Sequence, residues 1–176
     1  MPTTPIAESV PLPSEGTPPC RVESGRIADQ LERAYRGGAW HGPSLAEVIE
    51  EVDATLATRR TVPRVHTIHE IVWHVGFWTD AVRRRLEGEN VDGLAPGSDF
   101  PPPPQDPEAG WREAKAKLED AHRRLHADVL SLDDERLDEP SGDSTVRAQL
   151  LGLLQHHAWH GGQILVLGRA GAGGDR

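Results

Sequence analysis

Apolar residues recur every three or four positions in five stretches of this chain, and segments rich in proline, glycine and charged residues separate these stretches. Such spacing places the apolar side chains on one face of an α-helix. The pattern predicts helices over residues 22–37, 45–62, 67–88, 111–130 and 145–169. No stretch shows the alternation of apolar and polar residues that is typical of a half-buried strand. We therefore expect an all-α protein.

Two of the predicted helices begin with a capping box, in which a Ser or Thr and a Glu three residues later satisfy backbone N–H groups of the first turn. These pairs are Ser44 with Glu47 and Thr67 with Glu70. Four long helices and a shorter one after Ser44 favour an up-and-down four-helix bundle. The proline-rich loop at residues 89–109 would join the second and third long helices.

The two ends of the chain differ in composition from the middle. Residues 1–20 contain six prolines, which cannot occupy a helix interior or a central strand. We expect residues 1–21 to form a flexible tail, with a docking arm as the alternative. The bundle is expected to occupy residues 22–169, and residues 170–176 are expected to be flexible.

Composition excludes several classes of protein. The chain has 176 residues, a net charge of −9 and a pI near 5.4, which argues against a protein that binds nucleic acid through the phosphate backbone. The single cysteine, Cys20, excludes an internal disulfide and a multi-cysteine zinc site. No apolar run is long enough for a membrane span, and the N-terminus lacks the features of a signal peptide. We therefore expect a soluble cytoplasmic protein.

The stretch at residues 145–169 carries two histidines, His156 and His160, one helical turn apart. Residues four apart share a helix face, with Cβ atoms about 5–6 Å from each other, so both imidazoles can reach one metal ion. Their face continues through Leu153, Ile164 and Leu167, so we expect it to point inward. Unpaired polar rings are costly there, and a metal with a third ligand would satisfy them.

A third histidine, His74, lies in the apolar stripe of the predicted helix at residues 67–88. That stripe is expected to run through Ile71, His74, Phe77 or Trp78, and Ala81. Three neutral imidazoles from two helices would leave a coordination position for water or substrate, as in catalytic zinc sites. The alternative is that His156 and His160 are core histidines bonded to neighbouring protein groups.

Other histidines are weaker candidates. His122 and His126 are also four apart, but their helix face is charged, and we expect both at the surface. His157 is expected between the ligand face and the outside, with a structural role. It stands where a zinc peptidase of the HExxH type has its glutamate, which argues against peptide hydrolysis.

The roles of four further residues near the predicted helix starts remain open. His66 and His69 are expected to be exposed or to cap the helix. His41 follows a tryptophan in a loop, and nothing in the sequence places it. Glu70 can orient His74 as a hydrogen-bond acceptor or serve its own capping box.

Two segments, IHEIVWHVGFW at 68–78 and HHAWHGGQI at 156–164, resemble the DinB/YfiT-like superfamily of metal-binding four-helix bundles. GPSLAEVI at 42–49 is similar to the segment before the second helix of many members. The resemblance covers about residues 22–169. It implies that His74, His156 and His160 bind a divalent metal, whereas Gln163 matches the family pattern without an assigned role. Gly161 and Gly162 match it too and would allow close helix packing.

The resemblance implies two kinds of function. One is a metal-dependent S-transferase that uses a small thiol such as bacillithiol or mycothiol in stress response or detoxification. The other is a non-catalytic, damage-inducible metal-binding protein, and a third possibility is metal-dependent hydrolysis of a small molecule. Zinc is the first choice of metal, and nickel, iron, copper and manganese are alternatives. We expect a small-molecule substrate, a homodimer, and no nucleic-acid or membrane partner; the catalytic residues and the substrate are not predicted.

Overall fold

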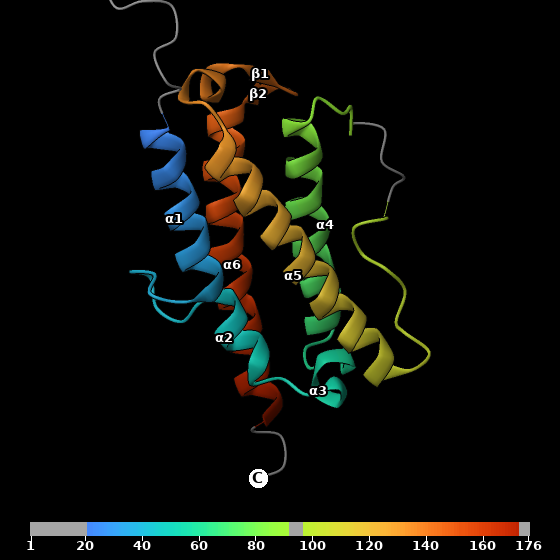
Figure 1. Cartoon of the computed structure of the whole chain (residues 1–176). Helices are drawn as coiled ribbons and strands as arrows, with labels where there is room; N and C mark the ends of the chain where they lie inside the picture. The colour runs from blue at the N-terminus through green and yellow to red at the C-terminus, as the bar shows by residue number, and fades with distance from the viewer. Residues whose placement is uncertain (1–20, 92–96, 173–176) are drawn as a thin grey trace, which may run out of the picture.

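A computed structural model describes residues 21–91 and 97–172 of the chain (Figure 1). The expected N-terminal tail, including Cys20, lies outside these residues except for Arg21. The helices are α1 (Val22–Arg36), α2 (Leu45–Glu50), α3 (Ala54–Thr58), α4 (Ile68–Leu86), α5 (Pro107–Ser131) and α6 (Val146–Ala172). A 3₁₀ helix, η1 (Asp134–Asp138), and two short strands, β1 (Pro140–Ser141) and β2 (Ser144–Thr145), connect α5 to α6.

The four long helices α1, α4, α5 and α6 pack as a bundle, which confirms the predicted all-α fold (Figure 1). α4 packs most extensively on α5 and next on α6, while α1 closes the bundle by packing on α5 and α6. α2 and α3 cover one end of the bundle, and η1 with the β1–β2 hairpin covers the other (Figure 1). None of the described helices is long and apolar enough to cross a membrane.

The segment after Ser44 differs from the single helix that the apolar spacing predicts. Ser44 and Glu47 form the predicted capping box at the start of α2, but α2 ends after six residues. Asp53 then accepts a hydrogen bond from the backbone N–H of Leu56 at 2.8 Å and starts α3. An aspartate at this position stabilises a new helix start, which divides the segment into two short helices.

The boundaries of the last two helices also differ from the sequence-based expectation. α5 begins at Pro107 rather than Trp111, because the side chain of Asp106 accepts hydrogen bonds from two first-turn N–H groups. The expected polar link before α6 is a two-stranded hairpin that turns at Gly142, whose φ of 58° lies in the left-handed region. The first turn of α6 is capped by Thr145, whose Oγ1 accepts from the N–H of Ala148 at 3.3 Å.

Two apolar clusters make up the core, one toward each end of the bundle. One cluster joins α2 and α3 to parts of α4, α5 and α6 that include Val75, Leu118 and Ile164. The other joins α1 to parts of the same helices that include Leu125 and Leu153. Between these levels, α5 and α6 carry histidines in place of aliphatic residues. The candidate site therefore lies in a polar layer between two well-packed apolar clusters.

Candidate metal centre

Three histidine side chains from two helices meet in this polar layer. His74 lies in the middle of α4, and His156 and His160 lie one turn apart in α6. One ring nitrogen of each lies within 4.8 Å of the other two. The ring centroids of His156 and His160 are 4.4 Å apart, and that of His74 is 5.1 and 5.0 Å from them. Within residues 21–91 and 97–172, these three form the one histidine, cysteine or carboxylate group that can hold a metal ion.

Gln163 fixes the orientation and the tautomer of His160. Its Oε1 lies 2.7 Å from Nδ1 of His160. A carboxamide oxygen can only accept a hydrogen bond, so Nδ1 carries the proton and Nε2 keeps its lone pair. Metal-bound histidines commonly donate one ring N–H to an outer acceptor in this way. Gln163 thus leaves Nε2 of His160 free to bind a metal ion.

His74 is held by groups from the loop between α4 and α5. Oδ2 of Asp99 lies 3.2 Å from Nδ1 of His74, although the two atoms are not aligned as a hydrogen bond. The same oxygen accepts from Nε1 of Trp78 at 3.4 Å. The ring of Phe100 stacks on His74 with a centroid distance of 4.3 Å. The carboxylate favours a proton on Nδ1, and this leaves the lone pair on Nε2, which faces the centre.

The contact between His74 and His156 is one that a metal ion would satisfy. Their Nε2 atoms lie 3.1 Å apart, and Nδ1 of His156 is buried without a hydrogen-bond partner among the described residues. Two facing lone pairs repel each other, and a shared proton would leave Nδ1 of His156 as an unpaired acceptor. Two nitrogens bound to one tetrahedral zinc ion at 2.0–2.1 Å lie about 3.3 Å apart. The residues therefore fit a divalent metal ion.

The protonation states also suit metal binding. Burial, followed by the charges of the other two histidines, lowers the pKa of His156 to about 4. Burial is also the largest cause that lowers the pKa of His74 and that of His160. All three rings are therefore neutral near pH 7, as a histidine must be to donate a lone pair to a metal.

The three histidines lie at the edge of the core rather than at its centre. The inward face of α6 runs through Leu153, His157, Gly161 and Ile164, which are buried, whereas His156 and His160 are half-buried. The face predicted for the histidine pair points inward through Leu153, Ile164 and Leu167, which are buried as expected, but the helix is rotated so that His156 and His160 lie at the border of this face. This rotation leaves one side of the site accessible.

The buried stripe of α4 is rotated in the same way. Its buried positions include Ile68, Val72, Val75 and Thr79, whereas His74, Phe77 and Trp78 are half-buried. The predicted stripe therefore contains two correct residues, Ile71 and Ala81, and three that border the core. His74 lies beside the apolar core instead of within it.

His157 and His122 are buried, contrary to the sequence-based expectation. Each is 1% exposed. Nε2 of His157 is 3.0 Å from Oγ1 of Thr79, whose hydroxyl donates to a backbone carbonyl, so His157 donates here. His122 stacks on Tyr35 with a centroid distance of 4.0 Å and lies 2.8 Å from Oε2 of Glu32. Both histidines belong to a packed polar layer next to the metal centre, and neither is part of the ligand group.

Glu70 serves its capping box and does not orient His74. Its Oε2 accepts from the N–H of Thr67 at 2.6 Å. The carboxylate also pairs with Arg60 at 3.1 Å and with His66 at 3.3 Å. His66 is half-exposed, in agreement with the expectation for the start of α4.

His69 and His41 lie away from the centre. His69 is 3% exposed, so the expectation of an exposed or capping residue is wrong. The early start of α5 explains the difference: a Cβ placed on Gly110, in the first turn of α5, would lie 3.7 Å from Nε2 of His69. His41 is exposed in the loop before α2 and is not part of the ligand group.

Sequence reasoning missed Asp99 and Phe100, which both touch His74. They lie in a loop, where side chains follow no helical period. A weak signal was present, because Asp99 and Phe100 directly precede Pro101, and a run of four prolines favours an extended conformation that could fix their position.

Two pockets flank the three histidines. The larger, of about 780 Å³, is lined by His160 and Gln163 together with mainly apolar side chains of α6, of the segment before α4 and of Phe100. The smaller, of about 290 Å³, reaches His156 from the side of Trp78 and Leu153. The larger pocket falls within the size range of small-molecule sites.

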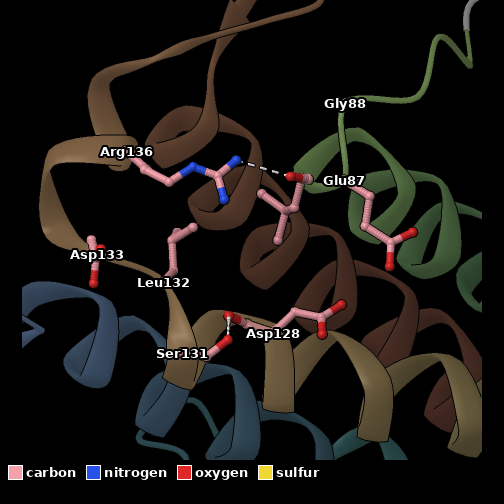
Figure 2. Close-up of a pocket in the computed structure, with 8 residues that line it drawn as sticks. Glu87, Gly88, Asp128, Ser131, Leu132, Asp133 and Arg136 are labelled. Carbon is pink, nitrogen blue, oxygen red and sulfur yellow. Dashed lines mark hydrogen bonds between the residues drawn. The ribbon is translucent and has the colours of Figure 1, made fainter.

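Another pocket lies at the opposite end of the bundle, between the ends of α4 and α5 and the start of η1 (Figure 2). Arg136 crosses it and donates to the backbone carbonyl of Leu86 at 3.0 Å (Figure 2). Ser131 donates to the carbonyl of Asp128 at 2.9 Å. This pocket contains no histidine, and its polar groups connect neighbouring helix ends, so we assign it a structural role.

Fold and site together define a helical bundle with a three-histidine group able to bind a divalent metal. A comparison with protein families agrees: the sequence profile of the DinB superfamily matches residues 26–164. The chain therefore belongs to the DinB superfamily. No curated protein and no solved structure is significantly similar to the chain.

Proposed function

We propose that this protein is a metal-dependent S-transferase that joins a small thiol, of the bacillithiol or mycothiol type, to an electrophile. The observation that carries the proposal is the position of the three histidines at the edge of the core, with a pocket of about 780 Å³ beside His160. A metal that only held the bundle together would not need such a pocket. Zinc is the proposed metal because three imidazoles with a fourth position suit it.

The chemistry divides between the metal and the protein. A bound divalent ion would lower the pKa of a thiol and hold the thiolate for attack. In the reaction the sulfur forms a bond to an electrophilic carbon, the leaving group departs with the bonding electrons, and the thiol proton passes to solvent. His74, His156 and His160 would hold the ion, and the apolar side chains of the pocket would contact the electrophile. No cysteine of the protein takes part.

The proposal is tested by assaying the zinc-loaded protein with bacillithiol or mycothiol and 1-chloro-2,4-dinitrobenzene as the electrophile. We expect thioether formation that requires both the metal and the thiol. His160→Ala should lose it, and Gln155→Ala, an exposed change on the same helix, should keep it. No turnover above the His160→Ala level with either thiol would overturn the proposal.

The alternative is a non-catalytic protein in which the metal stabilises the bundle. The half-buried contact between His74 and His156 favours it, because a metal there would join α4 to α6. That function predicts a large rise in melting temperature on adding zinc, with no reaction of either thiol. Hydrolysis of a small amide or ester has no specific support, since no carboxylate lines the described part of the pocket beside His160.

We further propose that the protein works in the cytoplasm and forms a homodimer. Two exposed apolar residues that do not line the pocket beside His160, Leu130 at 49% and Leu151 at 41% exposed, are candidates for an interface between two copies. Sedimentation velocity tests the dimer directly.

A further inference from the structure

The larger pocket beside His160 has an apolar wall and one arginine. The wall includes Val62, Val65, Trp159 and Val166, all of them exposed. Exposed aliphatic and aromatic side chains that line one concave surface are typical of a ligand site rather than of scattered surface residues. The arginine is Arg64, which lines the same pocket.

Arg64 differs from the two other arginines of its segment in having no side-chain partner among the described residues. Arg59 donates to the carbonyl of Gly171 at 2.6 Å, and Arg60 pairs with Glu70 at 3.1 Å. Arg60 also donates to the carbonyl of Val65 and so holds the turn in place. The guanidinium of Arg64 makes no hydrogen bond or ion pair with the part of the chain that the structure describes.

The backbone of Arg64 is strained. Its φ of 65° lies in the left-handed region, and Arg64 is the one described residue other than glycine with a positive φ. It occupies a turn in which the N–H of Val65 donates to the carbonyl of Val62 at 3.3 Å. Glycine or asparagine meets this geometry at lower cost. Backbone strain of this kind clusters at active sites and ligand-binding sites, and it therefore suggests a functional role for Arg64.

We propose that this pocket binds an anion with an aromatic or aliphatic body, such as a hydrophobic carboxylate, and that Arg64 pairs with its charged group. The apolar wall would hold the body of the molecule and bring it next to the metal centre at His160. Gln163 and His66 line the pocket too, but Gln163 is uncharged and its carboxamide contacts His160, and His66 lies 3.3 Å from the carboxylate of Glu70. Arg64 is therefore the group that recognises charge. The inference rests on the proposed function in that it names the substrate class for the same site.

The test compares 4-phenylbutyrate with its neutral analogue 4-phenylbutanamide by isothermal titration calorimetry on the full-length protein, zinc-loaded and zinc-free. We expect the acid to bind about three- to tenfold more tightly than the amide, as for a partly exposed charged pair. Arg64→Asn, which tolerates the left-handed turn, should make the two probes equal. Arg64→Lys should keep the preference for the acid in part.

Two further variants separate the two parts of the site. Trp159→Ala should weaken both probes by a similar factor, about fivefold, because it removes apolar contact. Arg112→Gln, which removes an exposed positive charge on α5 outside the pocket, should change the affinity for neither probe.

Arg64→Asn should also unfold at a higher temperature than the wild type, because the backbone strain is relieved. If Arg64 had a purely structural role, the variant would unfold at a lower temperature instead.

Three results would overturn the inference. The first is no saturable binding of either probe. The second is a preference for the acid that survives Arg64→Asn and disappears without zinc, which would place the carboxylate on the metal. The third is an affinity for both probes that falls as the protein dimerises, which would mean that a second copy of the chain occupies the pocket. Because no thiol is present, failure of the S-transferase assay leaves these measurements unaffected, and the converse also holds.

Discussion

His160 and Gln163 show how one contact can prepare a metal ligand. The 2.7 Å contact assigns the proton of His160 to Nδ1 and leaves Nε2 for the metal. Gln163→Leu should therefore lower zinc affinity by about tenfold or more, in the range found for outer partners of metal-bound histidines. Competition with a chromophoric chelator measures the affinity. Gln155→Leu, on the exposed face of the same helix, is the matched control, and equal loss in both variants would contradict the role given to Gln163.

His122 gives a pH-dependent contribution to stability. Burial lowers the pKa of His122 below its usual value of 6.5. As the pH falls below 6.5, the unfolded chain gains a proton at this residue while the folded protein does not, so the free energy of unfolding decreases. His122→Phe keeps a ring against Tyr35 and should reduce this pH dependence, by at most about 1.4 kcal/mol per pH unit.

Urea unfolding of the zinc-free protein between pH 7 and pH 5 measures the effect of His122. His126→Phe is the control, because His126 lies on the same helix and is not part of the fully buried layer. A wild-type slope in the His122→Phe protein would show that another group carries the pH dependence.

The sequence predicted where the three histidines meet but not the surroundings of each residue. Spacing of four in α6 and a third histidine in α4 suggested the group, and the resemblance to the DinB/YfiT-like superfamily selected His74, His156 and His160 as its members. The sequence did not predict the exact rotation of each helix about its axis. Buried and half-buried positions lie next to each other on an amphipathic helix, so a small rotation changes which residues face the core. His157 and His122 were misplaced for this reason. Asp99 was missed because it comes from a loop.

At the scale of helices, α4 and α5 approach each other closely at Gly76. A Cβ placed on Gly76 would lie 3.2 Å from the backbone Cα of Leu118, which cannot move like a flexible side chain. Gly76→Ala should therefore destabilise the protein by about 1–3 kcal/mol. Gly152, in the first half of α6, has no neighbouring atom within 4 Å of the position that a Cβ would take, so Gly152→Ala should instead stabilise it by about 0.5–1 kcal/mol.

Thermal or urea unfolding of the two alanine variants decides the point. Each variant is the control for the other, because the same substitution is made in two helices and the expected changes in the free energy of unfolding have opposite signs. A stabilised Gly76→Ala protein would mean that α4 and α5 are not packed as closely as described.

Helix existence was predicted more accurately than helix boundaries. The capping boxes at Ser44 and Thr67 are present as predicted because the pattern depends on local backbone geometry alone. The break at Asp53 was missed because apolar residues continue at helical spacing on both sides of it. The early start of α5 was also missed, although Asp106 before Pro107 is a recognisable start signal.

At the scale of the molecule, the metal centre lies between two apolar clusters that account for the fold. The clusters at the two ends of the bundle contain most of the buried aliphatic side chains, so we expect the bundle to keep its architecture without the ion. Replacing a ligand should therefore abolish metal binding while the helical content is kept. This separation allows the His160→Ala protein to serve as a folded control in the S-transferase assay.

The most direct test of the account is an anomalous difference map from a crystal of the zinc-loaded protein, collected at the zinc absorption edge. We predict one peak about 2.0–2.1 Å from Nε2 of His74, His156 and His160, with a fourth ligand on the side of the larger pocket. A map with no peak between these three nitrogens, or with zinc bound elsewhere while the rings keep their contacts to protein groups, would contradict it.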